Sequence, residues 1–225
     1  QQPHEPLLLS SAKAPNRELP PPHPKIPNTI IFTHSINLLE TIFDFANQTD
    51  TLSDEQTELI ALQQNVNHIV QVHPTATVRF LTDSDCEQSI RSDLLNATEA
   101  AELISYFRNE SIGMYKADLC RGVALHESGG LYFDVDLGAR MNLFETLQPT
   151  TDFATIRVHH FSKFPGTFFQ AFVASSPKHP IIYRYIELFL QHYRGQVHAD
   201  KLGIQLLKRA FDEIVVAQPQ YNATA

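Results

Sequence analysis

Two consecutive glycines, Gly129 and Gly130, constrain the fold of this chain more than any other feature. Before them, residues 114–128 repeat apolar side chains at helical spacing. After them, the segment "LYFDVD" begins as a buried strand and ends in two carboxylates. Glycine takes the left-handed conformation that ends helices without a steric penalty. The sequence therefore predicts a helix that leads directly into a strand.

Apolar segments and helical segments alternate along the rest of the chain. The sequence predicts strands at "NTIIFTHS" and "TVRFL" and near 153–158 and 168–174. It predicts a helix that a Ser53–Gln56 capping box opens and that ends near Val72. Further helices are expected over residues 86–92, 97–109, 180–193 and 200–215. Such alternation indicates an α/β fold whose mainly parallel sheet is flanked by helices.

The first 27 residues differ from the rest in composition. "ELPPPHPKIP" holds five prolines in ten residues, which favours an extended linker or stalk over residues 1–27. Residues 28–225 then form the folded domain. No apolar segment approaches the roughly 20 residues needed to cross a bilayer. The chain begins with Gln rather than Met, so we expect a processed or trimmed start; an anchor upstream of it would lie outside this sequence.

Composition and charge restrict the class of partner. Of the 225 residues, 43% are hydrophobic and 19% charged, as in globular proteins. The net charge of −8 argues against nucleic acid, because phosphate backbones bind basic surfaces. An anionic small substrate would need a bridging cation.

Asp134 and Asp136 supply the groups for such a cation. Residues two apart in a strand project from the same face, and two adjacent carboxylates repel unless a cation lies near them. Mg²⁺ and Mn²⁺ prefer oxygen ligands and keep positions open for substrate phosphates. Ligands of open α/β sheets also gather at the carboxyl ends of strands. The pair therefore predicts a metal ion that bridges the protein to a diphosphate.

The preceding helix carries three polar residues, Lys116, Asp118 and Arg121. Asp118 and Arg121 are three apart and share a helical face, so a surface ion pair is one interpretation. The helix also leads into the turn beside the acidic strand. We therefore expect Asp118 and Arg121, and to a smaller extent Lys116, to line the same cleft.

The central segment resembles a known family. "MYKADLCRGVALHESGGLYFDVDLGAR" is similar to the sugar-binding D-x-D region of glycosyltransferase family 32, which contains fungal initiating α-1,6-mannosyltransferases. "IPNTIIFTHS", "HPTATVRFLTDSDCEQSI" and "FFQAFVASSPKHPII" resemble its flanking strands and helices, so the resemblance covers about residues 26–195. It implies a GT-A type nucleotide-sugar-binding fold with a mainly parallel mixed sheet.

The resemblance also implies an activity and its site. The chain would be a retaining hexosyltransferase that uses Mn²⁺ or Mg²⁺ and a nucleotide sugar, GDP-mannose first and a UDP-hexose next. Its acceptor would be a glycan or glycolipid. Asp134 and Asp136 would bind the metal, and Asp118, Arg121 and Asp134 would bind the donor sugar.

Other positions carry over less directly. Thr33 and His34 would lie by the nucleotide, and Asp136, Arg121 and Gln170 would be catalytic. Gln170 replaces the family's usual asparagine, and Gly122 replaces a usual tyrosine. The family's further metal-binding histidine near the C-terminus has no motif here, which leaves open whether the catalytic domain is complete.

Cysteines and sequons bear on the compartment. Cys86 and Cys120 lie in apolar helical contexts, so we expect buried thiols, with a bridge between them as the alternative. The chain has four N-glycosylation sequons, at Asn47, Asn96, Asn109 and Asn222. The sequons, the stalk and the family's type II topology predict a glycoprotein of the Golgi or another secretory lumen. Its membrane association would come from a segment outside this chain.

Three histidines and two rival functions remain. His159 and His160 follow a predicted strand and are candidates to face the cleft, whereas His179 precedes Pro180 as a helix-entry residue.

A D-x-D-x-T phosphohydrolase would need threonine where Gly138 stands. A catalytically silent glycan- or nucleotide-sugar-binding domain of transferase ancestry is the second rival, and donor binding without turnover would identify it.

Overall fold

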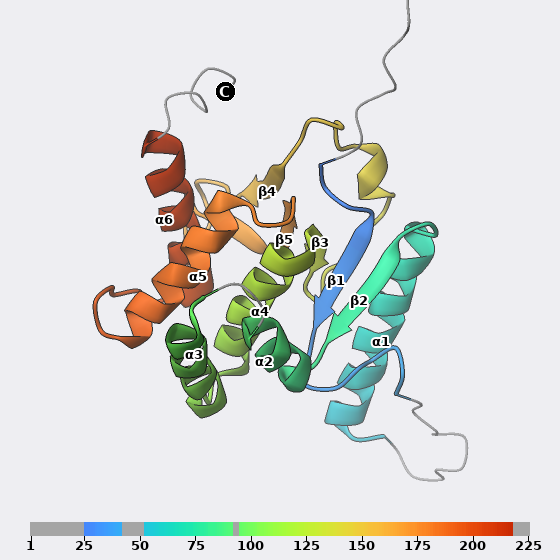
Figure 1. The fold of residues 1–225 in the computed structure, drawn as a ribbon. Helices are drawn as coiled ribbons and strands as arrows, with labels where there is room; N and C mark the ends of the chain where they lie inside the picture. The colour runs from blue at the N-terminus through green and yellow to red at the C-terminus, as the bar shows by residue number, and fades with distance from the viewer. Residues whose placement is uncertain (1–24, 42–51, 92–94, 218–225) are drawn as a thin grey trace, which may run out of the picture.

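A five-stranded sheet forms the centre of the protein (Figure 1). The computed structural model describes residues 25–41, 52–91 and 95–217. The predicted linker falls mainly in residues 1–24, outside the described residues, while Ile26 is buried in the core. The strands are β1 (Thr29–Thr33), β2 (Thr77–Leu81), β3 (Gly130–Phe133), β4 (Phe153–Arg157) and β5 (Phe168–Ser175), in the order β2-β1-β3-β5-β4.

Four of the five strands point the same way. β1 pairs in parallel with β2 and β3, whereas β5 is antiparallel to both β3 and β4. The carboxyl ends of β1, β2, β3 and β4 therefore lie at one edge of the sheet, called the carboxyl edge below. The predicted mainly parallel mixed sheet is confirmed.

Helices cover both faces of this sheet (Figure 1). Because strand side chains alternate between faces, Ile31 and Tyr132 join one core cluster and Ile30 and Phe133 the other. α1 (Asp54–Val72) and a short 3₁₀ helix pack on the Ile30 face, and the other α-helices pack on the Ile31 face. The helices are α1 (Asp54–Val72), α2 (Asp83–Arg91), α3 (Ala97–Asn109), α4 (Gly113–Ser128), α5 (Pro180–Tyr193) and α6 (Leu202–Ala217), with a short 3₁₀ helix at Leu143–Glu145.

The predicted helix ends are formed by local side-chain and backbone contacts. Ser53 and Gln56 make both hydrogen bonds of the capping box at the start of α1. His179 precedes α5, and its Nδ1 accepts from the Ile181 amide over 3.2 Å. Gly129 ends α4 at φ 62°, and a Cβ on Gly130 would lie 2.4 Å from the Thr29 carbonyl oxygen. The Gly-Gly turn is therefore required by both conformation and space.

The D-x-D pair does not extend the strand as expected. β3 ends at Phe133, and residues 135–136 form a turn closed by the Leu137 amide donating to the Asp134 carbonyl over 3.0 Å. Asp134 still donates its amide to Ala171 of β5. The prediction of a regular strand through Asp136 is wrong, because the chain leaves the sheet at its carboxyl edge.

The prediction for the two cysteines is also wrong. Cys86 of α2 and Cys120 of α4 form a disulfide, with Cα atoms 5.3 Å apart, instead of the free thiols expected. The two helices pack against each other, and each presents its cysteine to the shared core. The spacing of the two cysteines along the sequence gives no sign of this contact.

Among the described residues, none of the helices has the length and apolar character needed to span a membrane.

Candidate functional site

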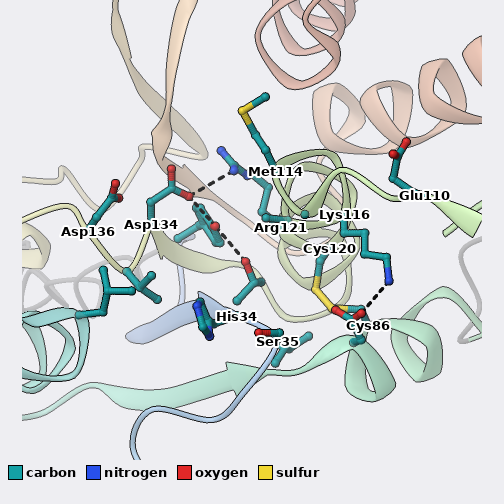
Figure 2. A pocket seen from close by; sticks show the side chains of 18 of the residues that line it. His34, Ser35, Cys86, Glu110, Met114, Lys116, Cys120, Arg121, Asp134 and Asp136 are labelled. Atoms are coloured by element: carbon teal, nitrogen blue, oxygen red, sulfur yellow. Dashed lines mark hydrogen bonds and ion pairs between the residues drawn. A yellow bond between two sulfur atoms is a disulfide. The ribbon is translucent and has the colours of Figure 1, made fainter. Parts of the chain in front are cut away.

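A cavity of about 600 Å³ opens at the carboxyl edge (Figure 2). The ends of β1 and β3 form its floor, and helices α1, α2 and α4 supply its sides. Its polar lining comprises Thr33, His34, Ser35, Glu58, Asp83, Glu110, Ser111, Lys116, Arg121, Tyr132, Asp134 and Asp136. Segments far apart in the sequence thus contribute to one site, at the edge where ligands of open α/β sheets bind.

Asp134 is held in this cavity by two neighbours. The Tyr132 hydroxyl donates to its Oδ1 over 2.6 Å, and Arg121 Nη2 lies 3.2 Å from the same oxygen. Thr33 Oγ1 lies 3.0 Å from the Tyr132 hydroxyl. The side chain of Asp134 is 30% exposed, so one carboxylate is both fixed from behind and open to a ligand.

Arg121 is the buried cation of the site and is only 3% exposed. Its guanidinium lies 4.6 Å from the centre of the Tyr132 ring, and Nη1 donates to the Gln170 carbonyl. Burial lowers the pKa of Arg121, but Tyr132, Asp134 and Asp118 around it raise the pKa well above its usual value. Arg121 therefore stays charged, and it lines the cavity as predicted.

Asp118 lies behind Arg121 rather than in the cavity lining. It is 1% exposed, with Oδ1 3.0 Å from Arg121 Nη2, and Oδ2 accepts from the Gly203 amide over 3.0 Å. Burial raises the pKa of Asp118 to about 6, with Arg121 opposing that rise. The ion pair between these helix neighbours is buried, not the surface pair considered above.

Gln170 also lies outside the cavity lining. Its Oε1 is buried without a hydrogen-bond partner among the described residues. A Cβ on Gly203 would lie 1.9 Å from that oxygen and 2.4 Å from Asp118 Oδ1. The start of α6 therefore fits against both side chains only because residue 203 is glycine.

Asp136 is exposed at the rim, and α1 holds the turn that carries it. Asn65 Nδ2 donates to the carbonyls of Val135, over 2.8 Å, and Leu137, over 2.9 Å. His68 Nε2 lies 3.0 Å from the Ala139 carbonyl oxygen. One helix thus fixes the backbone on both sides of Asp136.

The other predicted residues divide between the cavity and the surface. Thr33 and His34 both line the cavity, as expected for residues at the end of the first strand. Lys116 lines it too, and its Nζ pairs with Asp83 Oδ2 over 2.8 Å. His159 and His160 are exposed in the loop after β4 and do not line the cavity.

Comparison with known proteins agrees with this geometry. Residues 61–154 match the family described as a glycosyltransferase sugar-binding region containing a DXD motif. The predicted resemblance to a D-x-D glycosyltransferase sugar-binding region is confirmed over these residues. The matched segment runs from α1 through the D-x-D turn to the start of β4.

One solved structure supports the fold. The chain is similar to the PaToxG glycosyltransferase, with a TM-score of 0.52 and 13% sequence identity over 88% of this chain and 72% of that one. At this identity the similarity concerns the fold, which is GT-A-like as predicted. The comparison with curated proteins gives no match.

The residues present are suited to hold a divalent cation that also binds the diphosphate of a substrate. Asp134 and Asp136 offer hard oxygen ligands at the cavity, and only Oδ1 of Asp134 is engaged by Tyr132 and Arg121. The described residues hold no group of three potential metal-binding side chains. Mg²⁺ and Mn²⁺ commonly bind through one or two carboxylates and complete their shells with water and phosphate. Two carboxylates therefore suit a metal–diphosphate complex.

Sequence reasoning missed three residues of the candidate site. Tyr132 was counted as core, although strand alternation puts it on the same face as Asp134. Asn65 lies in the middle of a polar helix, and no local pattern distinguishes it from its neighbours. Gly203 follows a helix start, and only the packing against α4 shows its role.

Removal of the Asn65 hydrogen bonds should weaken metal binding at the D-x-D turn. Asn65→Ala frees the backbone on both sides of Asp136, so we expect Mn²⁺ affinity to fall roughly tenfold, as for other residues that orient metal ligands. Calorimetric titration of Mn²⁺ measures this. Asn67→Ala, at an exposed position of the same helix, is the control. Equal affinities in the two variants would contradict the role of Asn65.

Proposed function

We propose that this protein is a retaining hexosyltransferase that moves mannose from GDP-mannose, or failing that a hexose from a UDP-sugar, to a glycan or glycolipid acceptor. A divalent cation, Mn²⁺ first, would assist the transfer. The family match and the fold support glycosyl transfer. The donor, the stereochemistry and the metal are the parts that we propose.

One observation carries the proposal. The buried guanidinium of Arg121 and the open carboxylate of Asp134 lie side by side at the cavity. A fixed cation in a water-poor site stabilises developing negative charge strongly, because no solvent has to reorganise. A departing nucleoside diphosphate develops such charge. The carboxylate beside it suits the cation that a diphosphate carries.

The transfer makes and breaks one bond at the sugar. The bond between the anomeric carbon and the diphosphate oxygen breaks, and the acceptor hydroxyl oxygen bonds to the same face of that carbon while its proton passes to the departing diphosphate oxygen. Bound Mn²⁺ would neutralise charge on the diphosphate. Arg121 would bind the leaving group, and Thr33 and His34 would lie near the nucleotide.

We propose roles for Asp118 and Gln170 that differ from those expected from the sequence. Both pack around Arg121 and Gly203 outside the cavity lining, so we propose that they position Arg121 and do not touch the donor. Arg121 then carries the contact with the diphosphate side of the donor.

The runner-up function is a silent domain that binds a nucleotide sugar or a glycan. The described residues contain no cluster of three metal-binding side chains, which favours weak metal binding. Donor binding with Mn²⁺ but no release of nucleoside diphosphate, in the presence of a range of glycan acceptors, would establish this function.

Metal-dependent donor binding is expected to depend on Asp136. In a thermal-shift screen of GDP- and UDP-sugars with Mn²⁺, we expect at least one donor to raise the melting temperature of the parent. Asp136→Ala should abolish this rise without changing the melting temperature of the free protein, because Asp136 is exposed. Asp134→Ala should abolish it as well but also destabilise the free protein, since Arg121 loses a partner.

Glu55→Ala, at an exposed carboxylate in the first turn of α1, is the control for lost charge. Retention of donor-induced stabilisation in Asp136→Ala would rule out the D-x-D turn as the metal site. Failure of every donor to stabilise the parent would refute the proposed function.

The positioning role of Asp118 gives a second test. Asp118→Asn keeps an acceptor for the Gly203 amide but removes the charge beside Arg121. We expect a stability loss of about 1.5–3 kcal/mol, typical of a hydrogen bond to a charged group. Affinities for the sugar nucleotide and for the bare diphosphate should fall by the same factor in calorimetric titrations with excess Mn²⁺. A loss confined to the sugar nucleotide would instead place Asp118 against the hexose.

For the compartment we propose the Golgi or another secretory lumen, with a membrane anchor outside this chain. The disulfide and the sequons support an oxidising lumen. Asn96 and Asn109 are exposed at the two ends of α3, whereas Asn47 and Asn222 lie outside the described residues. Enzymatic deglycosylation of protein from its native host should lower its mass, and Asn109→Gln should reduce that shift. An unchanged mass together with cytosolic fractionation would contradict this location.

A further inference from the structure

The loop between β4 and β5 lies at the same edge of the sheet as the cavity. β4 ends at Arg157 and β5 begins at Phe168, and the two strands pair in antiparallel register there. Since β4 runs in the direction of β3, the loop at residues 158–167 emerges at the carboxyl edge. β5 separates β3 from β4, which is the edge strand (Figure 1).

Large apolar side chains are exposed on this hairpin. Phe161 at the loop is 85% exposed, while Ile156 and Phe169 are 52% and 40% exposed. Ile156 and Phe169 are register partners, so they lie side by side on one face. Phe168, the residue before Phe169, points the other way and packs against Phe211 of α6. The exposed face is therefore the one that α6 leaves uncovered.

Charge distinguishes the hairpin from the rest of the chain. The protein has a net charge of −8, yet no Asp or Glu occurs between Asp152 and Glu187. Lys163 is exposed in the loop that carries Phe161, and Arg157, the register partner of Phe168, is exposed at the base of that loop on the other face of the hairpin. Neither forms an ion pair with any described residue. We call Ile156, Arg157, Phe161, Lys163 and Phe169 the hairpin patch. It joins exposed apolar groups to uncompensated positive charge.

We propose that the hairpin patch docks the protein on the lumenal surface of a membrane that contains anionic lipid. Exposed apolar groups of this size mark protein or membrane contacts. Lys and Arg near an anionic leaflet each contribute about 1 kcal/mol of attraction, and aromatic rings favour the headgroup region. A side chain as exposed as Phe161 protrudes, which suits insertion into a fluid headgroup layer better than a fit into a rigid groove.

The position of the patch gives this docking a consequence. A membrane bound at the carboxyl edge would lie on the same side of the sheet as Asp134 and Arg121. The site would then face acceptors carried by lipids, a point that rests on the proposed function. Docking itself does not depend on transfer, so it is tested without donor or acceptor.

The experiment is co-sedimentation with vesicles at low and at physiological salt. Vesicles of phosphatidylcholine with phosphatidylserine should sediment the protein, and those of phosphatidylcholine alone should sediment much less. Phe161→Ser and Phe169→Ser should each weaken binding roughly tenfold through lost apolar contact. Arg157→Gln and Lys163→Gln should each weaken it about fivefold and reduce its salt dependence. All four positions are exposed, and melting temperatures verify that the variants fold.

Two matched variants serve as controls. Tyr183→Ser removes a partly exposed aromatic ring from α5, and Lys178→Gln removes an exposed cation from the opposite edge of the sheet. Both should bind vesicles like the parent. The proposal is overturned if the parent does not bind anionic vesicles, or if the hairpin variants bind no more weakly than the controls. If the parent sediments without vesicles and the hairpin variants do not, the patch instead binds a second copy of the chain.

Discussion

One guanidinium organises the site, because Arg121 is shared by two carboxylates from different parts of the chain. Asp118 reaches it from one turn earlier in α4, and Asp134 reaches it from the end of β3. A buried cation needs such partners, since its desolvation costs several kcal/mol. Arg121 therefore ties the central helix to the carboxyl edge of the sheet. Asp134, the first residue of the D-x-D turn, is therefore held in place, although Asp136 itself is exposed.

The surroundings of Arg121 restrict its movement from other directions. Cys120, the residue before Arg121, is joined to α2 by the disulfide. Lys116 of α4 also pairs with Asp83, the first residue of α2. α1 approaches from the other face of the sheet and holds the turn through Asn65. Preorganised groups of this kind stabilise charge without moving during a reaction. The cavity is therefore built mainly from rigid elements.

Sequence reasoning predicted the fold more fully than the site, for physical reasons. Helix ends depend on local contacts, so the Ser53 capping box and the Gly129 turn could be located from neighbouring residues. The D-x-D residues were found because charges after a buried strand are unusual. The Cys86–Cys120 disulfide and the Asn65 contacts join residues far apart in the sequence, and no local pattern encodes them. Asp118 was placed in the cavity because its helical face was known, but the position of α6 was not.

The absence of a side chain at Gly203 has a consequence for how this sequence can change. The space that a Cβ would need is filled by Asp118 and Gln170, which come from α4 and β5. A larger residue at 203 would require smaller ones at both other positions, and one of those holds Arg121. The three positions can therefore vary only together. Across related sequences, their amino acids should be correlated, although they lie on three separate elements of the chain.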